Sequence, residues 1–206
     1  MKKHLRTLCL RLKKNRLWHA RRGAVAIEAA LIIPLAVFIV IASMELYHYF
    51  RTASVVDRAA FTIANSLSMQ RELNDNQQCR LANDICTYHT IAQDLMTPLD
   101  YRRYGGMVIS LYATDTDSSG TAVWRTTPEW QRVYQGEQNS HSVAATLRPP
   151  DNFPQPSAND SAIVVEVFYR YTPFMLTSAF WQELGGEQQL SARAFYRPRF
   201  NDLPIK

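Results

Sequence analysis

Three groups of residues have types and spacing that could do chemistry. The first is a glycine followed by a glutamate at the start of an apolar run, the second is two cysteines, and the third is two aspartates in a polar turn. In that order they would support cleavage of the peptide bond by a protease, formation of a disulfide, and binding of a cation. The residues are Gly23 with Glu28, Cys79 with Cys86, and Asp115 with Asp117.

The motifs of common enzyme classes are absent from the sequence. The five histidines form no HExxH zinc motif, and there is no GxSxG nucleophile elbow, P-loop or GxGxxG loop. We therefore predict that the protein is not an enzyme and that it uses no cofactor and no small-molecule substrate.

The aspartates of the stretch DTDSSG resemble the first half of a calcium loop. The twelfth position of such a loop needs a bidentate glutamate, and here it would be Thr126. A polar hairpin turn explains the same residues. Asp115 and Asp117 are therefore weak candidates for metal ligands, and we expect no metal.

The charge of the chain is divided unevenly along its length. The 206 residues carry a formal net charge of +5, from 23 basic and 18 acidic residues. Nine of the basic residues lie in residues 1–22, which contain no acidic residue, so 14 basic residues face 18 acidic ones in the remainder. Because no basic surplus remains after this leader, we expect no nucleic-acid partner.

Residues 24–44 form the apolar stretch that is long enough to cross a membrane, and Glu28 is its only charge. At about 1.5 Å per residue, a helix of this length spans roughly 31 Å, which matches a hydrocarbon core of about 30 Å. The basic leader then places the N-terminus in the cytoplasm and the residues after about 45 across the membrane. Pro34 removes one backbone N–H from this helix and predicts a modest kink.

Three fates are open for such a segment. It could be the permanent anchor of a bitopic, uncleaved binding protein, or a signal peptide cut near Ala42 to release a secreted protein. It could also be processed before the apolar run. Glu28 favours the third fate, because a carboxylate near the start of an apolar helix is costly and therefore usually functional.

The stretch RRGAVAIE at residues 21–28 resembles the site that prepilin peptidases cut. In that family a basic leader ends in glycine, cleavage follows the glycine, and a glutamate is the fifth residue of the mature chain. Gly23 and Glu28 have that spacing. The continuation AVAIEAALIIPLAVFIVIASMEL is similar to the TadE/TadF minor pilins, or pseudopilins, of the tight-adherence (Flp, type IVb) pilus system.

This resemblance implies a function in the assembly of a tight-adherence pilus or a related secretion machine. It implies cleavage between Gly23 and Ala24 by prepilin peptidase, and a role for Glu28 in assembly. The implied partners are the inner membrane, prepilin peptidase, other pilus subunits and the assembly platform. The implied location is the bacterial inner membrane, crossed once, with a cytoplasmic N-terminus and a periplasmic C-terminal domain. Incorporation into a surface pilus is left open.

Apolar residues continue beyond the span in steps of three and four, from Tyr49 to Leu67. This period predicts that the helix extends to about residue 72. Cys79 and Cys86 follow in a compartment that oxidises thiols, and we predict a disulfide between them, with two free thiols as the alternative.

The rest of the chain predicts a small α+β domain. Patterns of apolar residues indicate a short helix at 87–95 and strands at 107–112, 121–125, 162–171 and 190–197. Three or four antiparallel strands packed on the outer half of the long helix would give a pilin-like layout. We expect a leader at 1–23 that is removed, a transmembrane helix at 24–44, its extension at 45–73, and an outer α+β domain at 74–206.

Overall fold

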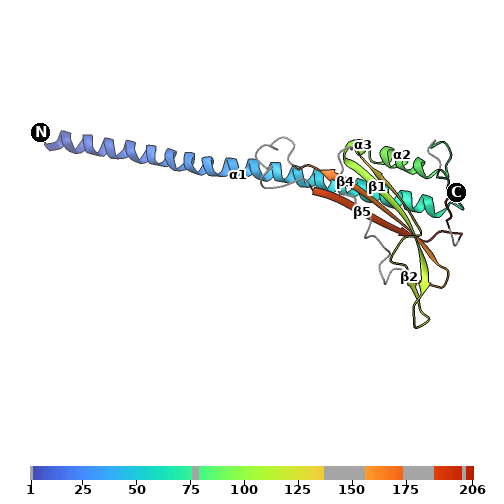
Figure 1. The fold of residues 1–206 in the computed structure, drawn as a ribbon. Helices are drawn as coiled ribbons and strands as arrows, with labels where there is room; N and C mark the ends of the chain where they lie inside the picture. Colours follow the sequence, from blue (N-terminus) through green and yellow to red (C-terminus); the bar gives the residue numbers. More distant parts are fainter. Residues whose placement is uncertain (1, 76–78, 137–155, 174–187, 201–202) are drawn as a thin grey trace. The chain divides into compact units, whose positions relative to one another are not determined.

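The structure is a computed structural model that describes residues 2–75, 79–136, 156–173, 188–200 and 203–206, with side chains from residue 25 onward. The chain divides into two compact units, Met1–Tyr47 and His48–Lys206, which we call unit 1 and unit 2. The elements in order are α1 (Lys2–Ser68), α2 (Ile85–Leu95), α3 (Tyr101–Tyr104), β1 (Gly105–Thr116), β2 (Ala122–Trp124), β3 (Trp130–Gln135), β4 (Ser161–Tyr171) and β5 (Gln188–Tyr196) (Figure 1).

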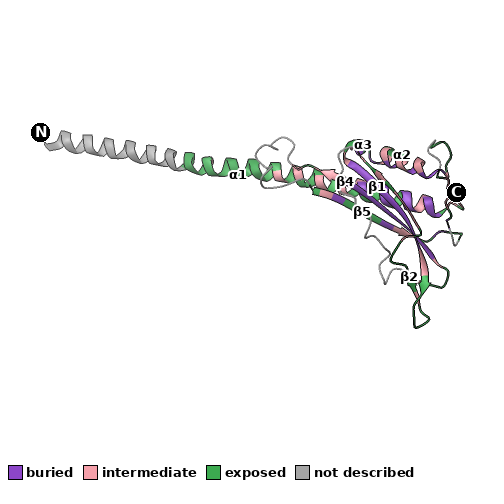
Figure 2. Cartoon of the chain, viewed as in Figure 1, coloured by how far each residue is buried: buried purple, intermediate pink, exposed green. Residues whose placement is uncertain are grey.

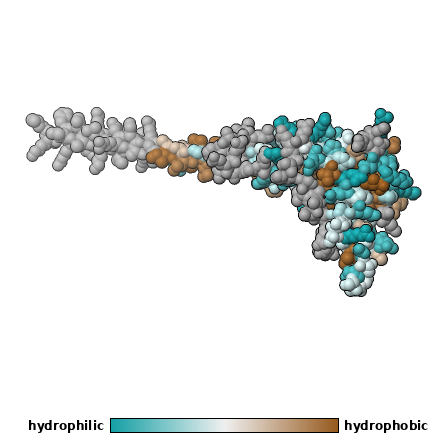
Figure 3. Space-filling view, in the orientation of Figure 1, coloured by the Kyte–Doolittle hydropathy of each residue, from teal (hydrophilic) through white to brown (hydrophobic). Residues whose placement is uncertain are grey.

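Unit 1 is the first part of α1, and its described part exposes apolar side chains on every side of the helix. One 18-residue window reaches a mean hydropathy of 2.7, and none of this window is buried. Figure 2 shows this stretch as exposed, and Figure 3 shows its hydrophobic surface. By length and composition it is the one helix in the described part of the chain that could cross a membrane. The exposed side chains include Val25, Ile27, Leu31, Ile32, Ile33, Leu35, Val37, Phe38, Ile39, Val40 and Ile41.

Unit 2 begins with the remaining turns of α1, which bury one apolar face. Ala60, Ile63 and Leu67 are each at most 1% exposed. Their spacing of three and four residues places them on the same side of the helix, and the small alanine lets the backbone lie close to its neighbours. At the end of α1, the N–H of Arg199 donates a hydrogen bond to the carbonyl of Ser68 at 2.9 Å.

An antiparallel sheet packs against this part of α1. The strand order is β2–β1–β4–β5, and β3 also pairs with β1. The central strands β1 and β4 pair over nine positions, as do β4 and β5. The strand β5 therefore forms one edge of the sheet, and β2 and β3 form the other edge (Figure 1).

Both faces of the two central strands are buried. One face joins α1 and α2 in the main core, where Ile109 and Val165 are fully buried. The opposite face includes Val108 and Phe168, which are also fully buried and contact each other. Burial in β5 instead alternates from Leu190 onward as far as Ala194, because one face of this edge strand meets solvent (Figure 2).

The face of the sheet opposite α1 contains a buried carboxylate. The side chain of Glu166, in the middle of β4, is 0% exposed, and the Nε of Arg193 on β5 lies 3.4 Å from its Oε1. Its second oxygen, Oε2, has no hydrogen-bond partner within the described ranges. Burial raises the pKa of Glu166, and the neighbouring Arg193 lowers it by less. The net effect favours the protonated form of this carboxyl.

The predicted α+β class and the antiparallel sheet are confirmed. The predicted helix at 87–95 corresponds to α2, and the four predicted strands correspond to β1, β2, β4 and β5. The sheet has five strands rather than the expected three or four. The additional strand is β3, which was not predicted. The helix α1 ends at Ser68 rather than near residue 72, since the chain turns at Met69 and Leu73 then bridges to Ile205.

Candidate functional site

The residues predicted to take part in processing and assembly lie on unit 1. Gly23 and Ala24 belong to α1, and the side chain of Ala24 falls outside the part of the chain that the structure describes. Glu28 is exposed among Val25, Ile27 and Leu31, which are 64%, 66% and 71% exposed. A carboxylate on an apolar surface is costly in lipid, which makes Glu28 a candidate functional residue.

Pro34 lies inside α1, and the helix continues past it. Because proline has no N–H, the carbonyl of Ala30 loses its usual helical donor. Further along, the Oγ of Ser43 donates a hydrogen bond to the carbonyl of Ile39 at 2.7 Å. Serine satisfies its hydroxyl within a membrane helix by bonding of this kind to the preceding turn.

The predicted disulfide between Cys79 and Cys86 is present, with the two Cα atoms 5.3 Å apart. Cys86 lies in the first turn of α2. Cys79 has a φ of 49°, a left-handed conformation that is uncommon for residues other than glycine. The disulfide therefore joins a tight turn to the start of α2 and closes the loop between them.

Asp84 organises this loop, and the sequence analysis did not single it out. Its Oδ2 accepts hydrogen bonds from the N–H groups of Leu81 and Arg80, both at 2.9 Å. The hydrogen bond from Leu81, followed by that from Arg80, holds the pKa of Asp84 below its usual value. An aspartate just before a helix usually caps its first turn. This carboxylate makes no cap bond to α2 and instead accepts from the loop.

The two aspartates considered as metal ligands stabilise the turn between β1 and β2. The Oδ1 of Asp117 accepts from the N–H groups of Ser119 and Thr121 at 2.8 and 3.0 Å, and from the Oγ of Ser119 at 2.5 Å. Asp115 accepts from the N–H of Thr116 at 2.8 Å. No group of three or more His, Cys, Asp or Glu side chains in the described part of the chain could hold a metal ion.

We expect the peptides that contain Cys79 and Cys86 to stay unlabelled when the denatured, unreduced protein is treated with a maleimide. Cys86→Ser should lower the free energy of unfolding of unit 2 by roughly 2–3 kcal/mol, because the disulfide restricts the unfolded chain. Denaturation of the two proteins in detergent measures this difference. Maleimide labelling of both Cys79 and Cys86 would show that the disulfide does not form in the cell.

Asp84→Asn should lower the melting temperature of unit 2 at pH 7, and this difference should shrink as the pH falls below about 4. The pKa of Asp84 in the folded state lies below the unfolded value of about 3.9, so the ionised carboxylate stabilises the fold above about pH 4. This contribution is lost as the pH falls through the folded-state pKa. Melting curves across this range test it, with Asp94→Asn, at an exposed position of α2, as control. A difference that does not change with pH would contradict the role of the charge.

Comparison with known proteins identifies the N-terminal part of the chain. Residues 23–65 match the family model described as TadE-like protein. No curated protein and no solved structure matches the chain. The match begins at Gly23 and includes Glu28 and Pro34, so the resemblance to TadE-like proteins of the Tad pilus system is confirmed for this segment. The family match supports involvement of the protein in the Tad pilus system, and the exposed apolar helix α1 supports its anchoring in a membrane.

Proposed function

We propose that this protein is a minor pilin, or pseudopilin, that acts in the assembly of a tight-adherence pilus or a related secretion machine. The observation that carries this proposal is the coincidence of three features at one place. The TadE-like match begins at Gly23, a basic leader precedes that glycine, and an exposed apolar helix with Glu28 near its start follows it.

The proposed first step is cleavage between Gly23 and Ala24 by prepilin peptidase, a protease of the membrane. Gly23 has no side chain, so the peptide bond that follows it can lie extended in a narrow protease cleft. Cleavage removes the nine positive charges of the leader and leaves an ammonium group on Ala24. Glu28 then lies about one turn inside the new helix, where the helix dipole favours a negative charge.

The proposed second step is packing of the trimmed helix against the helices of other pilus subunits and of the assembly platform. The apolar side chains of unit 1 are exposed on all sides of α1, so they need lipid or other helices around them. Glu28 would pair with the Ala24 ammonium group of a neighbouring subunit. In a medium of low dielectric, this pairing fixes the stagger between the two helices.

The proposed location is the bacterial inner membrane, with the N-terminus in the cytoplasm and unit 2 in the periplasm. The distribution of Lys and Arg supports this orientation, because nine of them precede the span. The disulfide between Cys79 and Cys86 supports it as well, since disulfides persist in the oxidising periplasm.

The mature N-terminus of the protein purified from cells tests this function against its alternatives. We expect intact-mass and N-terminal peptide analysis to show a chain that begins at Ala24. A chain that begins at Met1 would indicate a bitopic anchored protein, and one that begins near Ser43 would indicate a secreted protein. Either result would overturn the proposal.

A further inference from the structure

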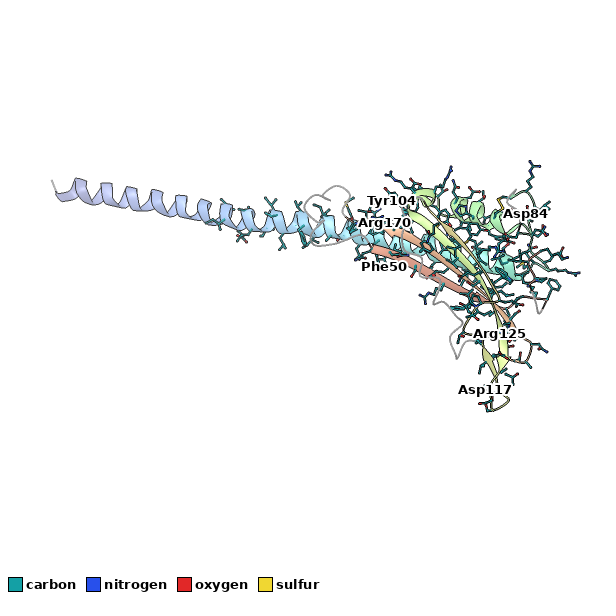
Figure 4. The ribbon with its side chains drawn as sticks, viewed as in Figure 1. Phe50, Asp84, Tyr104, Asp117, Arg125 and Arg170 are labelled. Atoms are coloured by element: carbon teal, nitrogen blue, oxygen red, sulfur yellow. A yellow bond between two sulfur atoms is a disulfide. The ribbon has the colours of Figure 1, made fainter. Side chains whose placement is uncertain are left out.

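Three short segments that are far apart in the sequence meet at the end of unit 2 where α1 stops. We call them the closing ladder, and they are residues 73–75, 83–85 and 203–206. Parallel bridges join Leu73 to Ile205 and Asn74 to Asp84, so segment 73–75 lies between the other two. Figure 4 labels Asp84 at this end of the unit.

One side of the central segment holds residues 203–206 through backbone hydrogen bonds. The N–H of Leu73 donates to the carbonyl of Pro204 at 2.9 Å, and the carbonyl of Leu73 accepts from the N–H of Lys206 at 2.9 Å. The N–H of Asp75 donates to the carbonyl of Lys206 at 2.8 Å. These three bonds require the backbone of the central segment to stay extended beside its partner.

The other side of the central segment is bonded to the loop that the disulfide closes. The N–H of Asn74 donates to the carbonyl of Asn83 at 2.8 Å, and the carbonyl of Asn74 accepts from the N–H of Ile85 at 3.0 Å. Asn83 and Ile85 both lie between Cys79 and Cys86 in the sequence. The disulfide therefore fixes the segment that supports this side of the ladder.

Side chains of β3 and of the main core complete the closed arrangement. The Nε1 of Trp130 donates to the carbonyl of Leu203 at 3.0 Å, and the guanidinium of Arg132 pairs with Asp75. Leu73 and Leu203 are both 0% exposed and belong to the main core. Opening of the ladder would therefore expose apolar side chains of that core to solvent.

We propose that the disulfide between Cys79 and Cys86 is a redox switch that closes or opens this end of unit 2. A dithiol reductant opens it by exchange. One thiolate of the reductant attacks a sulfur of the disulfide, and its second thiol resolves the mixed disulfide. The reductant leaves as a disulfide, and Cys79 and Cys86 gain two electrons and two protons.

The reduced loop gains conformational freedom, so its bonds to Asn74 become costly to maintain. Segment 73–75 then pairs with residues 203–206 alone, and a pair of such short segments is marginally stable in water. Loss of the disulfide thus opens a contact that lies outside the disulfide loop. The proposal is independent of cleavage at Gly23 and of pilus assembly.

A disulfide can also stabilise a protein solely by restricting its unfolded chain. In that case, reduction would increase the exchange of all slowly exchanging amides of unit 2 by a common factor, since they exchange through global unfolding. The switch instead predicts faster exchange at the closing ladder, with the central strands β1 and β4 unaffected.

Hydrogen exchange of the full-length protein in detergent, with and without dithiothreitol, provides the test. We expect the amides of Leu73, Asp75 and Lys206 to exchange at least about tenfold faster after reduction. The amides of β1 and β4 should keep their rates, which would show that the sheet stays folded. Unchanged rates at the three ladder amides, or an equal increase in β1 and β4, would overturn the proposal.

The coupling should also act in the opposite direction, because linkage between two sites is reciprocal. Lys206→Pro removes the N–H that donates to Leu73, whereas Lys206→Gln keeps this N–H and removes only the charge that pairs with Glu72. In glutathione buffers, we expect the equilibrium between disulfide and thiols to lie about threefold to fivefold further toward the thiols in Lys206→Pro. Mass spectrometry of the alkylated peptides that contain Cys79 and Cys86 measures this ratio. Equal ratios in the two variants would show that the loop and residues 203–206 are not coupled.

Discussion

Gly23→Leu should accumulate as a full-length membrane protein, with almost no chain that begins at Ala24. A leucine side chain at this position would occupy the space in which the protease must hold the extended backbone. Insertion of α1 should be unaffected, because the substitution lies before the apolar run and adds no charge. Immunoblots of membrane fractions, with the mass of the N-terminal peptide, measure the ratio of precursor to mature chain.

Two further substitutions separate cleavage from other effects of the leader. Ala20→Leu adds a similar volume three residues before Gly23 and should be processed normally. Gly23→Ala adds a single methyl group and should be processed more slowly than the native sequence. Normal trimming of Gly23→Leu would remove the main reason for treating residues 21–28 as a prepilin peptidase site.

The elements with strong local patterns could be predicted from the sequence. In α1, apolar residues at steps of three and four from residue 56 to residue 67 predicted one buried helical face, and that face packs in the main core. The long apolar run at 162–171 predicted a strand, and the structure places this strand, β4, inside the sheet with both of its faces buried. The disulfide was predicted because the expected orientation places both cysteines in a compartment that oxidises thiols, and it is present.

The strand β3 could not be predicted because its sequence lacks clear alternation. Trp130 and Tyr134 pack against the main core, and Arg132 lies between them on the same side of the strand. A charged residue at that position breaks the apolar pattern. The guanidinium of Arg132 forms an ion pair with Asp75, which is distant in the sequence. A charged residue can therefore lie on the core-facing side of β3 only because the tertiary structure supplies this partner.

A buried polar group of unit 2, the carboxyl of Glu166, could not be predicted from the sequence for a related reason. The sequence analysis did not single out Glu166, whose carboxyl is buried because the second face of the sheet is buried as well. The TadE-like segment, by contrast, is contiguous in sequence, and its motif could be read directly.

Glu28→Gln should be inserted and trimmed but should fail in assembly. Removal of the charge makes the span more apolar, so insertion should not suffer. Trimming should continue if the peptidase reads mainly Gly23 and the basic leader. In the assembled state, loss of the carboxylate would leave the Ala24 ammonium group of a neighbouring subunit without a partner in low dielectric, at a cost of a few kcal/mol. Co-purification with other pilus subunits and the number of surface pili should both fall.

The alternative is that Glu28 only needs to be compatible with the start of a helix, in which case glutamine would serve nearly as well. Glu28→Asp distinguishes the two roles, because it keeps the charge on a shorter side chain and should restore part of the assembly. Glu45→Gln removes a carboxylate just beyond the predicted span and should leave assembly unchanged. A Glu28→Gln strain with native numbers of pili and native recovery of partner subunits would show that the carboxylate does not pair with a neighbouring N-terminus.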